Sequence, residues 1–161
     1  MTRTMRNVLL VVSLSLGLVL APAAPASADG GRDHGAEVTS GRFVALPGGV
    51  DLAVRGHATM VRLGSWTLVG VHIRGLDGGA TYPTHVHNKM CVAPDYGGSH
   101  YQHTVGGAVD GENEIWPIVT TNRRGNGLGF AVHANRARPE AMSIVVHHPD
   151  TGVRLACVDL S

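Results

Sequence analysis

The sequence predicts an all-β fold, an antiparallel sandwich or barrel built from short strands. Two observations carry this prediction. Apolar and polar residues alternate over short runs separated by Gly-, Pro- and Asn-containing turns, and no stretch keeps a helical period. The chain has 161 residues and no internal repeat, so after an N-terminal leader it provides one domain with one moderate core.

Residues 1–28 have the composition of a signal peptide. Arg3 and Arg6 precede an apolar run over 8–20, and small residues lead up to Ala28. The apolar run is shorter than the roughly 18 residues of a membrane-spanning helix. We therefore expect cleavage near Ala28 and an extracytoplasmic or secreted mature protein. Its retention at the envelope and its oligomeric state are left open.

The mature chain has almost no net charge. Without Arg3 and Arg6, 11 of the 13 Lys and Arg remain against 12 Asp and Glu, which gives about −1. This balance provides no overall attraction to nucleic acid or to an anionic membrane, and neither is expected as a partner. Ten histidines in a chain this short favour a metal-binding role.

The two cysteines, Cys91 and Cys157, are expected to form one disulfide, because an exported chain enters an oxidising compartment. A pair of metal-binding thiolates is the alternative. It is disfavoured because the cysteines have neither Cys-x-x-Cys spacing nor a second pair.

The expected elements follow in chain order. Residues 29–40 lack apolar periodicity and are expected to be a flexible N-terminal segment, so the folded domain should cover 41–161. The expected strands cover 42–46, 50–54, 58–63, 66–74, the run around 85–87, 114–120, 128–133, 141–147 and 154–160. The Gly-rich stretch 88–113 is irregular, and a loop of that length in a small domain is often functional.

A His-x-His pair lies in the strand around 85–87. Alternate side chains of a strand share a face, so His85 and His87 project together while Val86 points the other way. Two imidazoles one pleat apart can bind one copper, zinc, iron or nickel ion. An isolated pair of this kind is more often a polar strand face, so the interpretation depends on other histidines.

A third histidine lies on a matching face. In the strand 141–147, Ile144 and Val146 have the parity of core residues, which places His147 on the outer face. His148, next to Pro149 at the strand end, is the reserve candidate for the same role. His85, His87 and His147 are therefore expected to converge on the outside of the sheet.

From about Ala58 to its C-terminus, the chain resembles the copper/zinc superoxide dismutases. The matching pieces are Gly75-Leu76, His85-Val86-His87, Cys91, Gly98-Ser99-His100, Val145-Val146-His147 and Gly152-Val153-Arg154-Leu155-Ala156-Cys157. The resemblance implies an eight-stranded Greek-key antiparallel β-barrel or sandwich with its metal site on the outside.

The resemblance also implies residue roles. His85, His87 and His147 match copper ligands, His100 matches the histidine between copper and zinc, and Arg154 matches the arginine that attracts the anion. Cys91 and Cys157 match the disulfide that ties the metal loop to the last strand. The implied activity is conversion of superoxide to oxygen and hydrogen peroxide by Cu(II)/Cu(I) cycling, with one copper per chain and with His100 carrying a proton.

The zinc site of that family has no match here. After His100 the loop offers only His103, which comes too early, and then Asp110, Glu112 and Glu114. We therefore expect no zinc, as in the copper-only branch of the family. Another group must then accept a hydrogen bond from the second nitrogen of His100, and the three carboxylates are equal candidates.

Two other functions stay open at this point. A non-enzymatic secreted copper-binding protein on the same fold is the main alternative, because the connection 149–153 is far shorter than the charged steering loop of the family. A metal-free interaction module is the other, and the four matching histidines argue against it.

Overall fold

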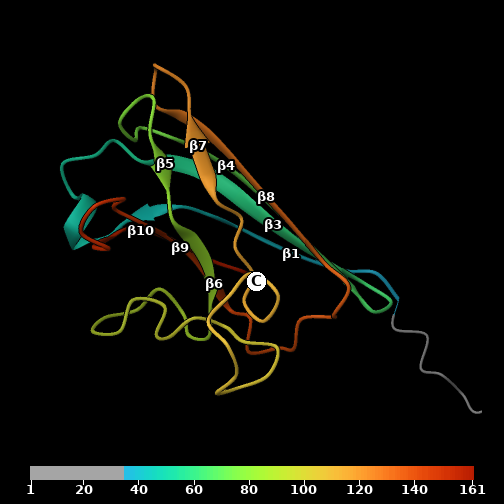
Figure 1. Cartoon of the computed structure of the whole chain (residues 1–161). Coiled ribbons are helices and arrows are strands. Elements are labelled where there is room, and N and C mark those ends of the chain that lie inside the picture. The colour runs from blue at the N-terminus through green and yellow to red at the C-terminus, as the bar shows by residue number, and fades with distance from the viewer. Residues whose placement is uncertain (1–34) are drawn as a thin grey trace, which may run out of the picture. The chain divides into compact units, whose positions relative to one another are not determined.

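The computed structural model describes residues 35–161, which form an all-β structure (Figure 1). The strands and one 3-10 turn are β1 (Glu37–Arg42), β2 (Val44–Ala45), η1 (Pro47–Gly49), β3 (Arg55–Leu63), β4 (Trp66–Arg74), β5 (Thr81–Tyr82), β6 (Thr84–His87), β7 (Val119–Thr121), β8 (Asn126–His133), β9 (Ser143–His147) and β10 (Arg154–Asp159). The expected signal peptide, 1–28, lies outside the described residues. Within those residues, no helix has the length and apolar character needed to cross a membrane.

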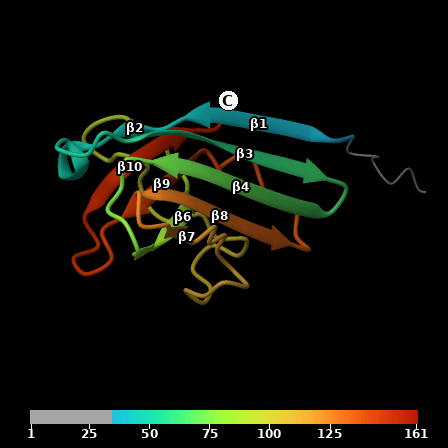
Figure 2. The same cartoon turned by 90° about the horizontal axis from the view of Figure 1, so that it is seen from above.

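The strands form two antiparallel sheets, as predicted for the fold class. The first has the order β1-β3-β4-β8-β7-β5 and the second the order β2-β10-β9-β6. Figure 2 shows β1, β3, β4 and β8 side by side in one layer, with β10, β9 and β6 in the other. Among residues 35–161, strand pairing keeps the two sheets separate and no closed barrel is detected.

Residues 35–161 form ten strands, whereas the resemblance implies eight; the difference corresponds to two runs that are each interrupted by a single residue. Phe43 separates β1 from β2, and Pro83 separates β5 from β6. At both interruptions the chain leaves the six-stranded sheet and enters the four-stranded one. Pro83 has no N–H to donate to a ladder, so a change of partner there costs little.

The main core lies between the sheets and follows the two-residue period of the strands. Val69, Val71 and Ile73 of β4 and Ile144 and Val146 of β9 are all at most 3% exposed. The predicted core-facing pair of β9 is therefore confirmed. The opposite face of β9 turns away from this core, and the histidine site is built there.

The expected flexible segment 29–40 is wrong in its last four residues, which belong to β1. Residues Glu37 to Arg42, the whole of β1, pair with residues 57–62 of β3. Backbone pairing and the buried guanidinium of Arg62, which donates to Glu37 Oε1 at 2.8 Å, hold β1 in place. Pattern reading missed this strand because its stability does not come from buried apolar side chains.

Two other expected strands are also corrected. Residues 50–54 form no strand: residues 50 and 51 continue the turn of η1, and the N–H of Leu52 donates to the carbonyl of Gly49 at 3.0 Å. The strand expected over 114–120 is reduced to β7 at its end. Pro117 cannot donate to a ladder, and Glu114 makes only an isolated bridge to Gln102.

Candidate metal centre

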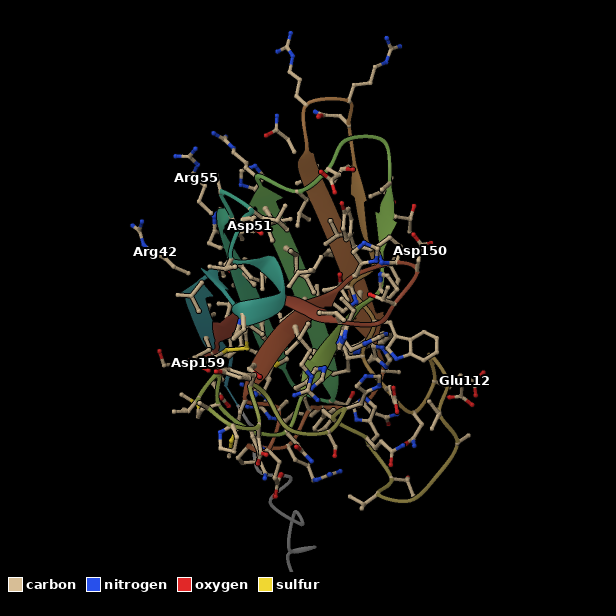
Figure 3. The ribbon with its side chains drawn as sticks, turned by 90° about the vertical axis from the view of Figure 1, so that its left-hand side faces the viewer. Arg42, Asp51, Arg55, Glu112, Asp150 and Asp159 are labelled. Carbon is tan, nitrogen blue, oxygen red and sulfur yellow. A yellow bond between two sulfur atoms is a disulfide. The ribbon has the colours of Figure 1, made fainter. Side chains whose placement is uncertain are left out.

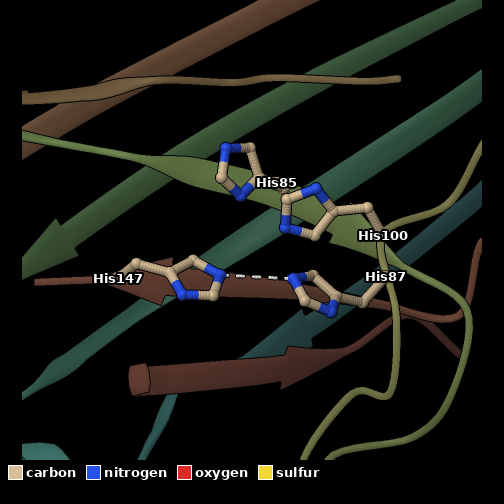
Figure 4. Close-up of side chains that lie close together, drawn as sticks. All are labelled: His85, His87, His100 and His147. Carbon is tan, nitrogen blue, oxygen red and sulfur yellow. Dashed lines mark hydrogen bonds between the residues drawn. The ribbon is translucent and has the colours of Figure 1, made fainter. Parts of the chain in front are cut away.

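Four histidines, drawn from two strands and one loop, meet at one point (Figure 4). Each offers one ring nitrogen, and these nitrogens all lie within 4.8 Å of one another. The members are His85 and His87 of β6, His100 of the loop 88–113 and His147 of β9. Strand alternation predicted the convergence of His85, His87 and His147, and the family resemblance implied His100 as the fourth member.

The pairing of β6 with β9 creates the shared face. His85 is opposite Val145 and His87 is opposite Ser143, while Val86 between them is fully buried in the main core. Because the strand alternates, both histidines of β6 point away from that core, as does His147 of β9. The site therefore follows directly from the period of two neighbouring strands.

The loop after β6 folds back on that strand and delivers His100. His87 and His100 form an isolated antiparallel bridge, and the N–H of Tyr101 donates to the carbonyl of Val86 at 2.8 Å. The return needs Gly98, whose φ of +71° is rarely adopted by other residues. A Cβ there would also lie 2.7 Å from the side-chain oxygen of Asn88.

The Cys91–Cys157 disulfide ties the start of this loop to β10, with a Cα–Cα distance of 5.8 Å. The expected pairing is confirmed. The N–H of Cys91 also donates to Asp159 Oδ1 at 2.7 Å, which adds a second link to the same strand. Together with Val145 and Leu46, Cys157 forms a small buried cluster outside the main core. The disulfide, this hydrogen bond and the buried cluster therefore hold the start of the loop against β10.

Hydrogen bonds indicate which ring nitrogens are available as ligands. Nδ1 of His87 donates to the carbonyl of Gly98 at 3.1 Å, and Nδ1 of His147 donates to the carbonyl of Gly152 at 2.9 Å. These partners accept only, so both rings carry the proton on Nδ1 and leave the Nε2 lone pair free. The two Nε2 atoms face each other at 3.3 Å, an arrangement that a cation stabilises.

His85 completes the set with its other nitrogen. Its Nδ1 atom is buried and has no hydrogen-bond partner in the described part of the chain. Buried polar nitrogens are rarely left unpaired, and metal ligation satisfies such an atom. The donor set that fits one ion is therefore Nδ1 of His85 and Nε2 of His87, His100 and His147.

The surroundings of His85, His87 and His147 favour the neutral imidazole. Burial, followed by the nearby imidazoles of His100 and His147, lowers the pKa of His85 to about 4. Burial is also the main cause that lowers the pKa of His87 to about 2 and lowers the pKa of His147 below its ordinary value. Neutral imidazole is the ligand form, so these three histidines can bind a metal ion at neutral pH without losing a proton.

Glu114 is the acceptor for the second nitrogen of His100. Its Oε2 atom lies 2.7 Å from His100 Nδ1, and the carboxylate is almost fully buried. Asp110 is used instead by the backbone N–H groups of Glu112 and Asn113, at 3.0 and 2.9 Å. Burial tends to raise the pKa of Glu114, but hydrogen bonds from Trp116, His100 and Gln102 bring it below its ordinary value.

Arg154 lies at the edge of the site. It is the register partner of His147, and its guanidinium donates to the carbonyls of Asp95, Tyr96 and Gly98. The carbonyl of Gly98 accepts from Arg154 at 2.7 Å and from His87 Nδ1 at 3.1 Å. One oxygen therefore fixes a positive charge beside a ligand histidine.

Trp116 is a neighbour of the site that pattern reading missed. Its ring lies edge-on to His85, with centroids 5.6 Å apart, and its indole N–H donates to Glu114 Oε2 at 2.9 Å. A signal was present in the sequence. Glu114 and Trp116 flank the buried Ile115, and such alternation places them on one face.

Other candidate histidines lie outside the cluster. His148, the reserve for His147, accepts from the N–H of Asp150 at 3.2 Å. His103 faces His133, with ring centroids 5.2 Å apart, and its Nε2 atom is buried without a hydrogen-bond partner in the described residues. Neither belongs to the group of four.

The chain matches no family model, and it matches no curated protein. What the site can bind is therefore inferred from its own residues. Four imidazole nitrogens can hold a metal ion of the kind that prefers nitrogen ligands, such as copper, zinc, nickel or iron.

Proposed function

We propose that this protein is an exported, copper-dependent superoxide dismutase with one copper per chain. The observation that carries the proposal is the meeting of four imidazole nitrogens within 4.8 Å, beside an arginine held by the same carbonyl as one of the ligands. The resemblance to the copper-only branch of the copper/zinc superoxide dismutases supports the same proposal.

The strand order is compatible with a Greek-key arrangement. β4 pairs with β8 rather than with the strand that follows it, and β10 returns to pair with β2 near the start of the chain. If β1 and β2, which only Phe43 separates, are counted as one run, and β5 and β6, which only Pro83 separates, as another, the ten strands make eight runs. We take this as the eight-stranded topology that the resemblance implies.

Copper suits the donor set better than the other candidate metals. Cu(II) favours a tetragonal field of nitrogen ligands, and at equal sites it binds more tightly than zinc, nickel or iron. His85, His87, His100 and His147 would hold the ion. Bound copper supplies one-electron exchange between Cu(II) and Cu(I), which is the chemistry that dismutation of superoxide requires.

His100 has the surroundings of a proton carrier. Its Nδ1 atom stays hydrogen-bonded to Glu114 while Nε2 faces the other ligands, so a proton can be held at Nε2 without loss of ring orientation. The same hydrogen bond occupies the nitrogen that a zinc ion would need. This favours the copper-only form of the site over a two-metal form.

Arg154 provides a permanent positive charge for an anionic substrate. Its guanidinium is oriented by three backbone carbonyls, so little conformational entropy is lost when a small anion binds beside it. Arg154 would bind and orient superoxide beside the four histidines. Export fits the disulfide, which is typical of an oxidising compartment.

The direct test uses the mature chain, residues 29–161, loaded with copper. Superoxide decay is followed by pulse radiolysis, and copper and zinc are counted per chain. We expect one copper, no zinc and fast decay. Copper bound tightly without turnover would instead support the non-enzymatic copper-binding function, and zinc at equal stoichiometry would contradict the copper-only site.

A further inference from the structure

A depression of about 450 Å³ lies on the outer face of the six-stranded sheet, at the end where β3 begins and β4 ends. It is lined by Arg42, Arg55, Gly56, His57, His72 and Arg74. The lining thus combines three guanidinium groups and two imidazoles with no carboxylate. Its volume is within the roughly 300–1,000 Å³ of small-molecule sites.

The strand register explains why these side chains gather. Arg42 of β1 is opposite His57 of β3, and His57 is opposite His72 of β4. Arg55 and Arg74 form the next outward-facing pair of the same two strands. The imidazole centroids of His57 and His72 are 5.5 Å apart. The cluster is therefore built on rigid paired strands.

The three arginines have no partner within residues 35–161. None of them takes part in an ion pair or in a side-chain hydrogen bond there, whereas Arg62, Arg136, Arg138 and Arg154 all do. Figure 3 shows Arg42 and Arg55 extending into solvent on one side of the molecule. Asp51, also labelled there, belongs to none of the ion pairs found among the described residues.

We propose that this depression binds a phosphate or sulfate group. The planar fork of arginine matches two oxygens of such an anion, and imidazole N–H groups can donate to the others. A metal ion at the His57–His72 pair is disfavoured, because three neighbouring positive charges would repel it. The ligand is the free anion or the same group carried as an ester on a larger molecule.

The proposed anion site is independent of the proposed copper chemistry. Its residues lie on β1, β3 and β4 of the six-stranded sheet, whereas the strand-borne metal ligands lie on β6 and β9 of the other. Failure of one proposal therefore leaves the other untouched. Dismutase activity measured on the same samples separates the two.

The test is calorimetric titration of the copper-loaded mature chain with inorganic phosphate, glucose 6-phosphate and glucose. We expect both phosphates to bind at millimolar concentration or below, and glucose not to bind. The double variant R55Q/R74Q should bind phosphate at least about tenfold more weakly, because each substitution removes a charge-assisted hydrogen bond. Tighter binding of glucose 6-phosphate than of inorganic phosphate would identify an ester as the ligand.

R123Q/R124Q is the charge-matched control. These two exposed arginines lie in the turn between β7 and β8 and do not line the depression. We expect this variant to bind phosphate as the parent chain does. An equal loss in both double variants, or no phosphate binding by the parent chain, would overturn the site. Circular dichroism confirms that each variant is folded.

Discussion

The imidazole of His100 and the carboxylate of Glu114 form a 2.7 Å hydrogen bond on the side of His100 that faces away from the other three histidines. Glu114 also accepts from Trp116 and Gln102, so its position is fixed by three donors. A rigid acceptor of this kind orients the ring and keeps its other nitrogen directed at the site.

Replacing Glu114 by Gln should lower the proposed dismutase activity by about 10–100-fold, because the amide carries no negative charge to stabilise the His100 proton. Copper should remain bound, since all four imidazoles are still present. Superoxide decay and copper per chain are the measurements. Glu112→Gln is the control, because Glu112 is exposed and does not contact His100. Equal losses in both variants would rule out the specific role of Glu114.

Replacing His147 by Ala should reduce copper affinity by more than the roughly 10–100-fold typical of a lost outer-shell partner, and activity should disappear with it. The adjacent His148→Ala variant is the matched control, since His148 lies outside the cluster and bonds only to the turn that follows. Competition with a copper chelator measures the affinity. If His148→Ala lost copper and His147→Ala did not, the ligand assignment on β9 would be wrong.

Replacing Arg154 by Ala should slow turnover while leaving copper bound. The guanidinium is not part of the four-histidine group, and its loss removes the positive charge proposed to attract the anion. If the proposed activity is present, raising the salt concentration should slow turnover by the parent chain more than by the variant, because salt screens the attraction expected from Arg154. Arg123→Ala is the control for a charge remote from the site. Loss of the metal in Arg154→Ala would show that Arg154 mainly supports the loop through its carbonyl contacts.

The metal-free protein should lose stability as the pH falls from 7 to 5. Burial lowers the pKa of His85 to about 4 and that of His87 to about 2, whereas both titrate near 6.5 when unfolded. Between these values the unfolded chain binds more protons, so stability is full above about pH 6.5 and declines below it. Urea unfolding at several pH values measures the slope.

The variant His85→Ala should show a shallower slope over the same range, because it removes one of the groups whose pKa is lowered on folding. The window from pH 7 to 5 lies above the range in which carboxyl groups titrate, which separates the histidine effect from that of Glu114. Stability that stays constant between pH 7 and 5 in the parent chain would contradict the neutral state assigned to the buried imidazoles.

Alternation along single strands was sufficient to predict much of the site. Val86 and Val146 are buried in the core, so the histidines that follow each of them point outward. That relation depends only on the two-residue period, which holds wherever a strand has one buried face. The disulfide was predictable as well, because two cysteines in a chain that is expected to be exported have few other fates.

Pairings between distant segments could not be read from alternation. From the sequence, Asp110, Glu112 and Glu114 are equal candidates for the partner of His100. In the folded loop, only Glu114 is hydrogen-bonded to the imidazole of His100. The shared carbonyl of Gly98 was also hidden, because a backbone oxygen has no signature in the sequence. The strand β1 was missed for a related reason, since its support comes from Arg62 of β3.

By itself, the sequence determined the all-β class, the outward direction of His85, His87 and His147, and the partners of the disulfide. These depend on side-chain period and on cysteine chemistry, which act locally or pairwise along the chain. Only the tertiary structure decided which carboxylate supports His100, where Arg154 is held, and which arginines gather on the other sheet. Those relations depend on loop closure and strand register, because they join segments that are distant in the sequence and come close together only in the folded sheets.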